Sequence, residues 1–452
     1  MTTIPPAPRI TVIGTGYLGA TQAVCMAHLG FEVLAVDVDP GKIEALASGR
    51  LPFYEPGLDT LLVDTLATGR LRFSTDFDDA AAFGDVHFVC VGTPQSSGSD
   101  AADLRYVDAA FGELARRITG RALLVGKSTV PVGTADRLAA MVREMSPAGD
   151  ALELAWNPEF LREGYAVDDT LRPDRLVFGV TSAWAERMLR EVFAPLVADG
   201  VPVVVADPAT AELVKVAANS FLATKISFIN AMAEVCEAAG ADVSLLAKAL
   251  SYDDRIGGRF LKPGLGFGGG CLPKDIRAFR ARAEELGVSA AVTFLHEVDQ
   301  INLRRRSRTV DLVRELADGE LQGVRVAALG AAFKPDSDDV RDAPALDVAR
   351  LLYLEGASVV VYDPQANANA HRAYPDLDYA SSLAEAVNGA DVVVLLTEWA
   401  EFVSADPEDM GVLVAHRRIV DGRSALDVEN YRAAGWEYRA LGRPAEVGVT
   451  RS

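Results

Sequence analysis

The fold is decided by residues 9–19, which read RITVIGTGYLG. The apolar run Arg9–Ile13 predicts a short β-strand, the glycines after it predict a tight turn, and the stretch from this turn to Gly30 predicts a helix. A second predicted strand, Phe31–Val36, ends in Asp37. Strand, glycine turn, helix, strand and acid in this order predict the start of a parallel α/β sheet that helices cover on both faces.

The same alternation continues through the first part of the chain and restarts in its last third. Further β-rich runs in the first part lie at Val86–Val91, Ala122–Lys127 and Val201–Val205. In the last third, strands are expected at Arg325–Leu329, Ser358–Tyr362, Asp391–Leu396 and Arg418–Val420. The pattern predicts two α/β domains, which are candidates for a duplicated architecture.

Between these regions the sequence changes character. Residues Ala209–Ala239 contain neither Pro nor Gly and carry apolar residues at helical spacing, and a second helical stretch, Ser289–Ala317, lies beyond a glycine-rich loop. We therefore expect two Rossmann-like, doubly wound parallel-sheet domains joined by a long central helix and a helical middle domain. The expected boundaries are 1–206 for the first α/β domain, 207–312 for the helical domain, 313–442 for the second α/β domain and 443–452 for a tail.

The composition excludes several classes of protein. The 452 residues are enough for about three domains of about 150 residues each, and with 50% hydrophobic and 24% charged residues the chain has no signature of disorder. The net charge of −20 argues against nucleic acid as a partner, because the overall field repels polyanions. Any anionic ligand must therefore meet a local basic pocket.

The cysteines argue against a structural metal and against a disulfide framework. Cys25, Cys90, Cys236 and Cys271 are far apart and form no zinc-ligand spacing. So few thiols fit a reducing compartment. The first ten residues, MTTIPPAPRI, do not read as a signal peptide, and no apolar run approaches the roughly 20 residues of a membrane helix. We expect a cytoplasmic protein without metal, membrane or nucleic-acid partner.

The first glycine turn has the spacing of a dinucleotide site. Gly14 would make the tight turn, Gly16 would let the backbone approach a pyrophosphate, and Gly19 would allow helix and strand to pack closely. Glycines also end strands for structural reasons, but Asp37 follows at the end of the next strand, where a carboxylate binds ribose hydroxyls and repels a 2′-phosphate. The pattern favours NAD over NADP as the cofactor.

The second unusual stretch is residues 262–275, KPGLGFGGGCLPKD, with five glycines in the seven residues 264–270. Such a backbone can approach a ligand closely. Cys271 stands where a helix is expected to begin, and the helix N-terminus and Lys274 both favour its thiolate form. The other three cysteines are expected to be buried and inert.

A nicotinamide cofactor combined with a thiolate indicates a definite chemistry. An alcohol oxidised to an aldehyde can be captured as a thiohemiacetal, which loses a second hydride to become a thioester that water hydrolyses to a carboxylate. Residues 262–275, which we call the cysteine loop, do not by themselves distinguish this chemistry from a one-step oxidation of an aldehyde.

Six motifs together resemble the UDP-glucose 6-dehydrogenase family, within the wider group of nucleotide-sugar dehydrogenases. The resemblance extends from Arg9 to about Arg423, in the family's order. The motifs are Gly14–Gly19, Val91–Pro94, Ser128–Thr134, Asn157–Gly164, the cysteine loop, and Ala332–Pro335 with Asp339–Arg341. The resemblance implies NAD-dependent, four-electron oxidation of UDP-glucose.

The resemblance also implies roles for individual residues. Cys271 would be the nucleophile, Lys215 would stabilise negative charge on the substrate oxygen, and Asn219 would position the sugar. Asp275 would orient water or assist proton transfer. Lys215 and Asn219 lie four residues apart on the long predicted helix, so they share a face, which without the resemblance would be read as solvated.

By the same resemblance, Glu159 is the leading candidate for the general base in thioester hydrolysis, and Thr129 would contact both the cofactor and the catalytic water. The spacing of Glu159 and Glu163 would also suit a surface pair on a helix. Sequence leaves open which group takes the proton at each step, because carboxylate, lysine and threonine can share a relay.

The residues that the resemblance assigns to ligands form two sets. Cofactor contacts are expected from Gly14, Gly16, Tyr17, Leu18, Gly19, Asp37, Lys42, Thr93, Thr129, Glu163, Lys274 and Arg341. Substrate contacts are expected from Glu159, Phe160, Leu161, Lys215, Asn219, Arg255, Phe260, Leu261, Lys262, Pro263, Gly264, Gly268, Lys334 and Arg423. Each lysine or arginine in these sets would otherwise be read as solvated surface.

The run Arg255–Leu261 resembles the UDP-glucose branch, in which Arg255 would enter the partner subunit's site. The alternatives are another nucleotide sugar, such as GDP-mannose or a UDP-N-acetylhexosamine, and a sensor of NAD or nucleotide sugar without catalytic activity. Small departures from the usual family pattern occur at Ala231, Ser337 and Ser424. The family is usually dimeric or larger, so we expect a homodimer or larger homo-oligomer, with the long helix as a candidate seam.

Overall fold

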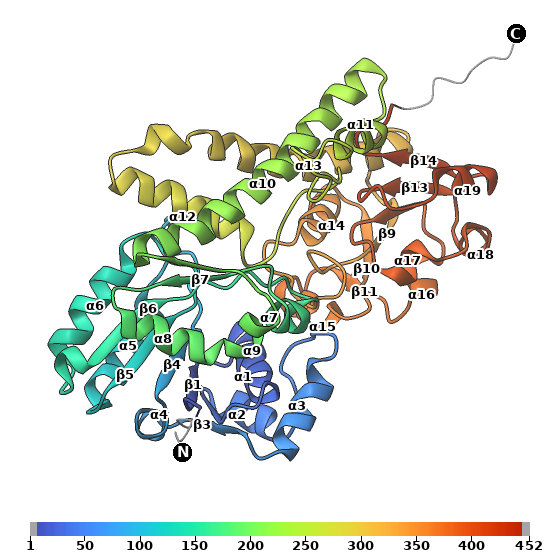
Figure 1. The fold of residues 1–452 in the computed structure, drawn as a ribbon. Coiled ribbons are helices and arrows are strands. Elements are labelled where there is room, and N and C mark those ends of the chain that lie inside the picture. Colours follow the sequence, from blue (N-terminus) through green and yellow to red (C-terminus); the bar gives the residue numbers. More distant parts are fainter. Residues whose placement is uncertain (1–6, 445–452) are drawn as a thin grey trace, which may run out of the picture. The chain divides into compact units, whose positions relative to one another are not determined.

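The computed structural model describes residues 7–444, so residues 445–452 of the predicted tail lie outside the described part. The chain forms two compact units (Figure 1). The first contains the residues up to Ala218 together with Arg277–Gly287, and the second contains Asn219–Ile276 together with the residues from Val288 onward. The helical stretch that was expected to be a separate middle domain is thus shared between the two units, and the three-domain division stays a prediction.

The first unit is built on an eight-stranded sheet. Its strand order is β3-β2-β1-β4-β5-β6-β7-β8, whose first six strands have the order of a dinucleotide-binding domain. The strands are β1 Ile10–Ile13, β2 Val33–Val36, β3 Leu71–Ser74, β4 Val86–Val89, β5 Ala122–Gly126, β6 Leu152–Trp156, β7 Leu176–Gly179 and β8 Val203–Ala206. In β1, β2, β4 and β5 every residue is buried, as expected of a sheet covered on both faces.

The sheet of the first unit departs from the predicted parallel arrangement at one pairing. β6 and β7 run antiparallel, through the pair Trp156 and Gly179, and β7 and β8 are again parallel to each other. Gly179 is required there, because a Cβ would lie 2.6 Å from the Cβ of Ala211. The last two strands therefore reverse direction relative to the first six.

Two apolar clusters pack against the two faces of this sheet. The helices that cover the sheet therefore have one buried side and one solvated side. Local capping sets several helix starts: the Asp39 side chain accepts backbone N–H bonds at the start of α2, and Ser182 does so at α8. The helices are α1 Tyr17–His28, α2 Pro40–Ala47, α3 Leu58–Ala67, α4 Phe77–Phe83, α5 Arg105–Arg117, α6 Thr134–Met145, α7 Ala166–Leu171, α8 Ala183–Val192 and α9 Ala194–Ala198, with a 3₁₀ turn at Gly149–Ala151.

The second unit contains a six-stranded parallel sheet of order β11-β10-β9-β12-β13-β14. This repeats the order of the first six strands of the other sheet, so the expected duplication of architecture is confirmed. The strands are β9 Arg325–Leu329, β10 Ser358–Tyr362, β11 Asp378–Tyr379, β12 Val392–Leu395, β13 Arg418–Asp421 and β14 Glu437–Ala440. Each sheet has its topological switch point beside its first strand, where ligands of such folds bind.

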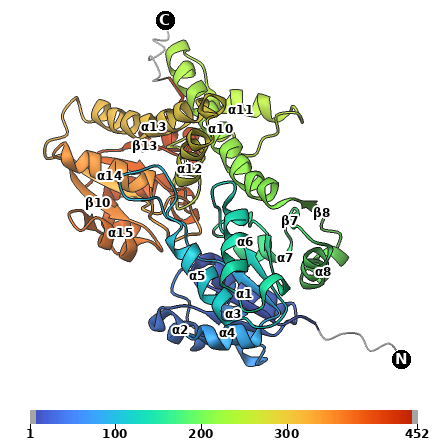
Figure 2. The same ribbon diagram turned by 90° about the vertical axis from the view of Figure 1, so that its left-hand side faces the viewer.

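The helical part contains one continuous helix of 32 residues, α10 Pro208–Ala239, close to the predicted stretch (Figure 2). The remaining helices are α11 Val243–Ser251, α12 Leu272–Glu285, α13 Phe294–Leu316, α14 Pro344–Leu354, α15 Asn367–Ala373, α16 Leu383–Val387, α17 Ala400–Val403, α18 Pro407–Leu413 and α19 Val428–Ala433, with a 3₁₀ turn at Ser289–Val292. Within residues 7–444, none of the helices combines the length and the apolar character needed to span a bilayer.

Candidate functional site

The glycine turn after β1 has the geometry that an approaching pyrophosphate requires. Gly14 has φ +88°, and a Cβ on Gly19 would lie 1.7 Å from the carbonyl oxygen of Gly14, so helix and turn pack directly on each other. Around Gly16 the position of a Cβ is open space. Gly16 is also the N-cap of α1 and offers no side chain to its N–H groups. The turn therefore leaves backbone donors and room for a diphosphate, and its residues fit NAD.

Asp37 lies at the end of β2 next to this turn. Its Oδ2 accepts hydrogen bonds from the backbone N–H (2.7 Å) and hydroxyl (3.1 Å) of Thr15, and the Lys42 ammonium lies 3.9 Å from it. The three predicted cofactor elements, glycine turn, acid and Lys42, are thus brought together by the structure.

Two substitutions in the turn separate folding from cofactor binding. We expect Gly19→Ala to destabilise the first unit by about 2–3 kcal/mol or more, because the new methyl overlaps backbone. Gly16→Ala enters open space in an extended backbone and should leave the melting temperature unchanged. Its methyl would occupy the approach to the turn and should weaken NAD binding by about 10-fold, or about 1.4 kcal/mol. Thermal unfolding and NAD titration check both; unchanged NAD affinity in Gly16→Ala would contradict the site.

The loops that follow β4 and β5 are joined to each other. The Thr93 hydroxyl donates to the carbonyl oxygen of Thr129 (2.9 Å), and the Ser128 hydroxyl donates to that of Val91 (2.6 Å). Both loops leave the carboxyl ends of neighbouring strands. The predicted positions Thr93 and Thr129 therefore lie together.

Glu159 and Lys215 form a pair in the first unit. The Lys215 ammonium lies 3.2 Å from Glu159 Oε1, and both side chains are largely buried. The backbone N–H of Leu161 donates to Glu159 Oε2 (2.8 Å), and the Phe160 ring lies 5.4 Å from the Lys215 ammonium. A carboxylate held this way by a lysine can exchange protons with it, so the solvated-surface interpretation of both residues is wrong.

A third charged group next to this pair was not singled out by sequence. Lys127 is buried at the end of β5 and donates to Asn157 Oδ1 (2.9 Å), and burial lowers its pKa. The charges of Glu159 and Lys215 act on the same group, in opposite directions. Its position directly before the motif Ser128–Thr134 is the feature of the sequence that could have identified it.

Glu55 is a second residue that sequence analysis missed. Its carboxylate is buried and accepts the backbone N–H groups of Gly164 and Ala166 (both 2.7 Å), and the Tyr17 hydroxyl donates to it. The pKa of Tyr17 is raised by its burial and by this carboxylate. Glu55 thus fastens the segment that carries Glu163 to the first residue of α1.

Glu212, three residues before Lys215 on α10, fastens the loop that carries Thr129. Its carboxylate is buried and accepts the backbone N–H groups of Gly133 (2.7 Å) and Ala135 (2.6 Å) at the start of α6. Burial raises the pKa of Glu212 to about 7. Sequence offered no signal for this residue, because its partners are backbone groups 77 and 79 positions away.

The raised pKa gives a pH prediction. In the unfolded chain Glu212 titrates near its ordinary value, so the folded state binds the proton more tightly and loses stability as pH rises through about 7. Between about pH 5 and pH 8, the free energy of unfolding of the first unit should fall by about 2 kcal/mol more in the parent protein than in Glu212→Gln. Native-state hydrogen exchange of the β5 amides, in both proteins, measures this difference. A difference independent of pH would contradict the burial of the carboxyl group.

In the second unit, Cys271 directly precedes α12, as predicted, and its side chain is exposed. Its carbonyl oxygen accepts the backbone N–H of Asp275 (3.0 Å) in the first turn of that helix. Cys25, Cys90 and Cys236 are buried, and burial raises the pKa of Cys25 and Cys90 to about 12. The exposed thiol is therefore the one suited to react.

Two other predicted residues lie beside the start of α12. Asn219 Nδ2 donates to Asp275 Oδ2 (2.6 Å), and the Lys274 ammonium lies 2.6 Å from Asp275 Oδ1. Asn219 and Asp275 are buried. The structure thus brings Asn219, Lys274 and Asp275 together at the helix that begins after Cys271.

The glycines before Cys271 are needed for close contacts. A Cβ on Gly268 would lie 2.2 Å from the carbonyl oxygen of Asp342, and one on Gly270 would lie 2.3 Å from the guanidinium carbon of Arg341. Arg341, predicted to reach the NAD pyrophosphate, pairs with Asp339 (2.7 Å). Its guanidinium therefore lies against the residue that precedes the cysteine.

The three cationic side chains that were predicted to bind the nucleotide sugar differ in their surroundings. Lys334 follows β9 and its ammonium lies 5.7 Å from the Phe333 ring, and Lys262 lies 3.7 Å from Glu398. Arg423 follows β13 and is buried: its guanidinium donates to the carbonyl oxygens of Leu396 (2.5 Å), Phe333 (3.1 Å) and Gly266 (3.3 Å). Arg423 thus joins the cysteine loop to the ends of the strands.

Other predicted substrate residues lie close to these cations or at the surface. Leu261, Pro263 and Gly264 are buried, whereas Phe260 is exposed with φ +64°. Arg255 is exposed and pairs with Asp253 (2.7 Å). Ser424, one of the departures from the family pattern, has φ +50°, a conformation that Asn adopts more easily than Ser.

The second sheet also has an acid at the position of Asp37. Asp363 Oδ2, after β10, accepts the backbone N–H groups of Ala331 (2.8 Å) and Ala332 (3.0 Å) and the indole N–H of Trp399 (2.9 Å). This oxygen is fully occupied by protein donors. Asp363 thus supports the loop after the first strand of its sheet, as Asp37 does through Thr15 in the first sheet. Among the described residues no group of three or more metal-binding side chains gathers.

Three family models match the chain. They are the NAD-binding domain (residues 8–197), the central domain (209–304) and the UDP-binding domain (327–428) of the UDP-glucose/GDP-mannose dehydrogenase family.

Similar proteins span nearly the whole chain. The UDP-glucose 6-dehydrogenase of Rhizobium meliloti is 41% identical over 438 residues, covering 96% of this chain and 100% of the relative. The UDP-glucose 6-dehydrogenase TuaD of Bacillus subtilis is 39% identical, covering 98% and 95%. Among solved structures, a UDP-glucose dehydrogenase from Pyrobaculum islandicum has a TM-score of 0.90 at 36% identity, covering 98% and 99%. A UDP-D-ManNAc dehydrogenase from Pyrococcus horikoshii has a TM-score of 0.84 at 27% identity, covering 96% and 99%.

Proposed function

The chain belongs to the UDP-glucose/GDP-mannose dehydrogenase family, and we propose that it oxidises UDP-glucose to UDP-glucuronate with two molecules of NAD. The observation that carries the proposal is the exposed thiol of Cys271 at the start of α12, beside Asn219, Lys274 and Asp275. A protein that only binds nucleotides has no use for an exposed nucleophile next to a buried amide and carboxylate.

The chemistry of the two oxidations centres on Cys271. When bound, NAD accepts one hydride in each oxidation step. Oxidation of the sugar's C6 alcohol gives an aldehyde, and the Cys271 sulfur adds to its carbon to form a thiohemiacetal. Loss of a second hydride gives a thioester, and water cleaves the carbon–sulfur bond to release the carboxylate and restore the thiol.

The charged side chains supply the proton transfers. We assign to Lys215 the stabilisation of negative charge on the C6 oxygen, because its ammonium already balances the carboxylate of Glu159. Glu159 is then the base that takes a proton from the hydrolytic water. Asp275, held by Asn219 and Lys274, is the second carboxylate available to orient that water.

Substrate binding is assigned to the switch point of the second sheet. Lys334 after β9 and Lys262 before the glycine loop would offer cations to the diphosphate of the nucleotide sugar. Phe260 and Leu261 would cover the sugar. Arg423 remains assigned to nucleotide binding, where its guanidinium also holds the backbone that lines the site.

One assay separates the rival functions. The absorbance of NADH is followed after mixing the protein and NAD with UDP-glucose, GDP-mannose or UDP-N-acetylmannosamine in turn. We expect UDP-glucose to give the highest kcat/KM. A higher value with another sugar would move the substrate assignment within the family. Absence of NADH with every sugar, together with measurable NAD binding, would favour the sensor.

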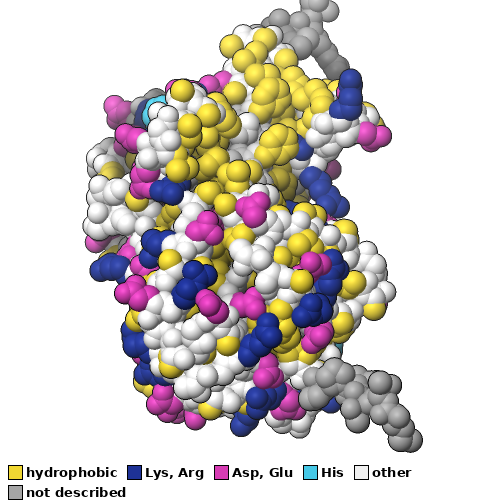
Figure 3. Space-filling model, turned by 60° about the vertical axis from the view of Figure 1, so that its left-hand side comes forward, with side chains coloured by type: hydrophobic (Ala, Val, Ile, Leu, Met, Phe, Trp, Pro, Cys, Tyr) yellow, Lys and Arg dark blue, Asp and Glu magenta, His cyan; other side chains and the backbone are white. Residues whose placement is uncertain are grey.

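We also propose that the chain works as a homodimer through α10. Phe221, Phe228 and Val235 are spaced seven residues apart on this helix and are 65%, 47% and 57% exposed. Figure 3 shows hydrophobic side chains gathered in the upper part of one face of the molecule. Sedimentation of the protein and of Phe228→Glu tests the proposal: a monomer in both cases would contradict it.

Four cysteines without a disulfide among the described residues support a reducing compartment such as the cytoplasm.

A further inference from the structure

The glycine loop before Cys271 is held by a side chain that none of the assigned roles uses. Asn302 lies on α13 and is buried, with 1% of its surface exposed. The Phe267 N–H donates to Asn302 Oδ1 (2.7 Å), and Asn302 Nδ2 donates to the Phe267 carbonyl oxygen (2.9 Å). Two hydrogen bonds to the backbone of one residue fix both its position and its orientation.

Gly266 shows that the loop is shaped to fit this side chain. It has φ +91°, and a Cβ at this position would lie 2.0 Å from Asn302 Oδ1. The contact with α13 therefore requires a glycine at this position of the sequence motif.

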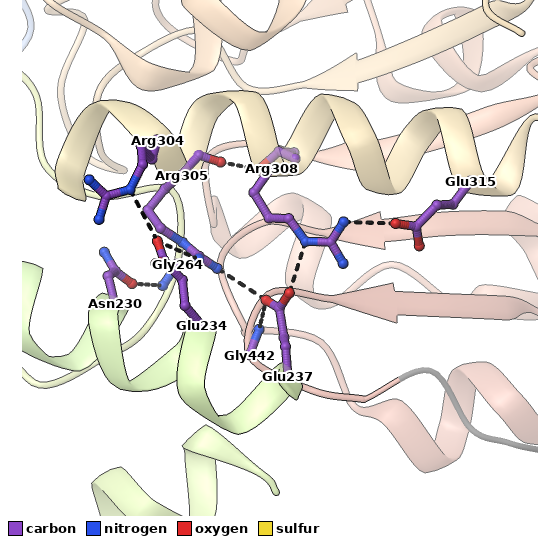
Figure 4. A network of polar contacts seen from close by, with 10 residues as sticks. Asn230, Glu234, Glu237, Gly264, Arg304, Arg305, Arg308, Glu315 and Gly442 are labelled. Carbon is purple, nitrogen blue, oxygen red and sulfur yellow. Dashed lines mark hydrogen bonds and ion pairs between the residues drawn. The ribbon is translucent and has the colours of Figure 1, made fainter. Parts of the chain in front are cut away.

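Other groups hold the same loop just before Phe267. Asn230 on α10 is fully buried, and its Oδ1 accepts the N–H of Gly264 (2.9 Å) (Figure 4). The Arg423 guanidinium donates to the carbonyl oxygen of Gly266 (3.3 Å). Of these three side chains, Asn302 is the one that makes two hydrogen bonds to a single residue.

The position of Cys271 depends on such attachments because glycines have no side chains that could anchor the loop. Of the seven residues 264–270, only Leu265 and Phe267 have side chains. A chain of glycines has wide conformational freedom, so an unfastened loop would spread the position of the thiol over many conformations. Phe267 is four residues before Cys271, and between them the N–H of Gly269 donates to the Arg341 carbonyl oxygen (2.9 Å).

We propose that Asn302 is a positioning residue for the reaction: through the backbone of Phe267 it holds the glycine loop so that the Cys271 sulfur meets the C6 carbon. The inference rests on the proposed function, in which that sulfur captures the aldehyde. Asn302 itself touches neither thiol nor sugar in this role.

The first test replaces Asn302 with the similarly sized Leu. Because a misplacement of about 1 Å costs about 100-fold in rate, we expect Asn302→Leu to lower kcat by about 100-fold while KM for UDP-glucose and the affinity for NAD change by less than about 3-fold. Hydrogen exchange of the amides in residues 264–270, measured without substrate, should become at least about 10-fold faster, because the Phe267 N–H loses its acceptor.

Ser227→Ala is the matched control. The Ser227 hydroxyl is buried on α10 and donates to the carbonyl oxygen of Val298 (2.7 Å), one turn before Asn302 on α13. Its removal costs one buried hydrogen bond between α10 and α13 without touching the loop. We expect kcat and loop exchange to stay within about 2-fold of the parent protein. An equal effect of both substitutions would reduce Asn302 to a helix-packing role and overturn the proposal.

Asn302→Asp keeps the proposal falsifiable if the Leu variant does not fold. A protonated carboxyl group can accept from the Phe267 N–H and donate to its carbonyl oxygen, as the amide does, whereas a carboxylate would repel that oxygen. The ratio of its kcat to that of the parent should therefore rise as the pH falls. A ratio independent of pH, or parent-like kcat and exchange in Asn302→Leu, would overturn the proposal. Loop exchange needs no turnover, so a parent protein inactive on UDP-glucose would refute the proposed function and leave this test intact.

Discussion

Cys271→Ser should lower turnover of UDP-glucose by at least about 10³-fold, because removal of a nucleophile costs at least this much. A serine hydroxyl stays protonated near neutral pH, so it cannot capture the aldehyde. The uncaptured aldehyde regains the hydride and returns to the alcohol. The substitution exchanges sulfur for oxygen on an exposed side chain and leaves the nucleotide turn after β1 untouched. NAD affinity should therefore be unchanged, as titration of the protein with NAD would show.

Cys236→Ser is the matched control for this result. Cys236 lies in the same unit but is buried, and burial raises its pKa, so it is not a nucleophile at neutral pH. The control should keep its kcat and lose only stability, since it places a hydroxyl in an apolar cluster. Full activity of Cys271→Ser would remove the thiol from the mechanism.

Lys215→Met is expected to have the second largest effect. The substitution preserves the length of the side chain but removes the charge that stabilises the C6 oxygen, which should lower kcat by about 10²–10³-fold. It also leaves Glu159 largely buried without its cation.

Steady-state kinetics with UDP-glucose measures this loss of kcat. Lys248→Met removes a charge from an exposed lysine on α11 and should leave kcat unchanged. If Lys215→Met kept the parent's kcat, the role of the pair with Glu159 in catalysis would be contradicted.

Sequence predicted the architecture because its signals are local. The period of apolar residues and the positions of glycines gave the strands β1, β2, β4 and β5 and the helix α10 within a few residues. The reversed pairing of β6 with β7 was not predicted, because strand direction depends on a chain path that single-strand patterns do not record. The strands β3, β6, β7, β11 and β14 were likewise not singled out, three of them partly solvated at their ends or sides.

The residues that hold the site were harder to predict than the residues that act. Cys271 and Asp37 carry chemistry that a motif displays, and Lys215 was assigned through the resemblance to a known family. Glu55 and Glu212 act on backbone N–H groups, which every residue but proline possesses, at separations of 77 to 111 positions. No residue type at the receiving end marks such a contact, so only the folded chain shows it.

The proposed function has one enzyme perform two consecutive oxidations through the same thiol. It is tested most directly by the amount of NADH formed when a limiting, known quantity of UDP-glucose is consumed completely. Absorbance gives the NADH, and chromatography of the same sample gives the nucleotide sugars. We expect two NADH for each UDP-glucose, with UDP-glucuronate as the product. One NADH per UDP-glucose, with the aldehyde as the product, would contradict it.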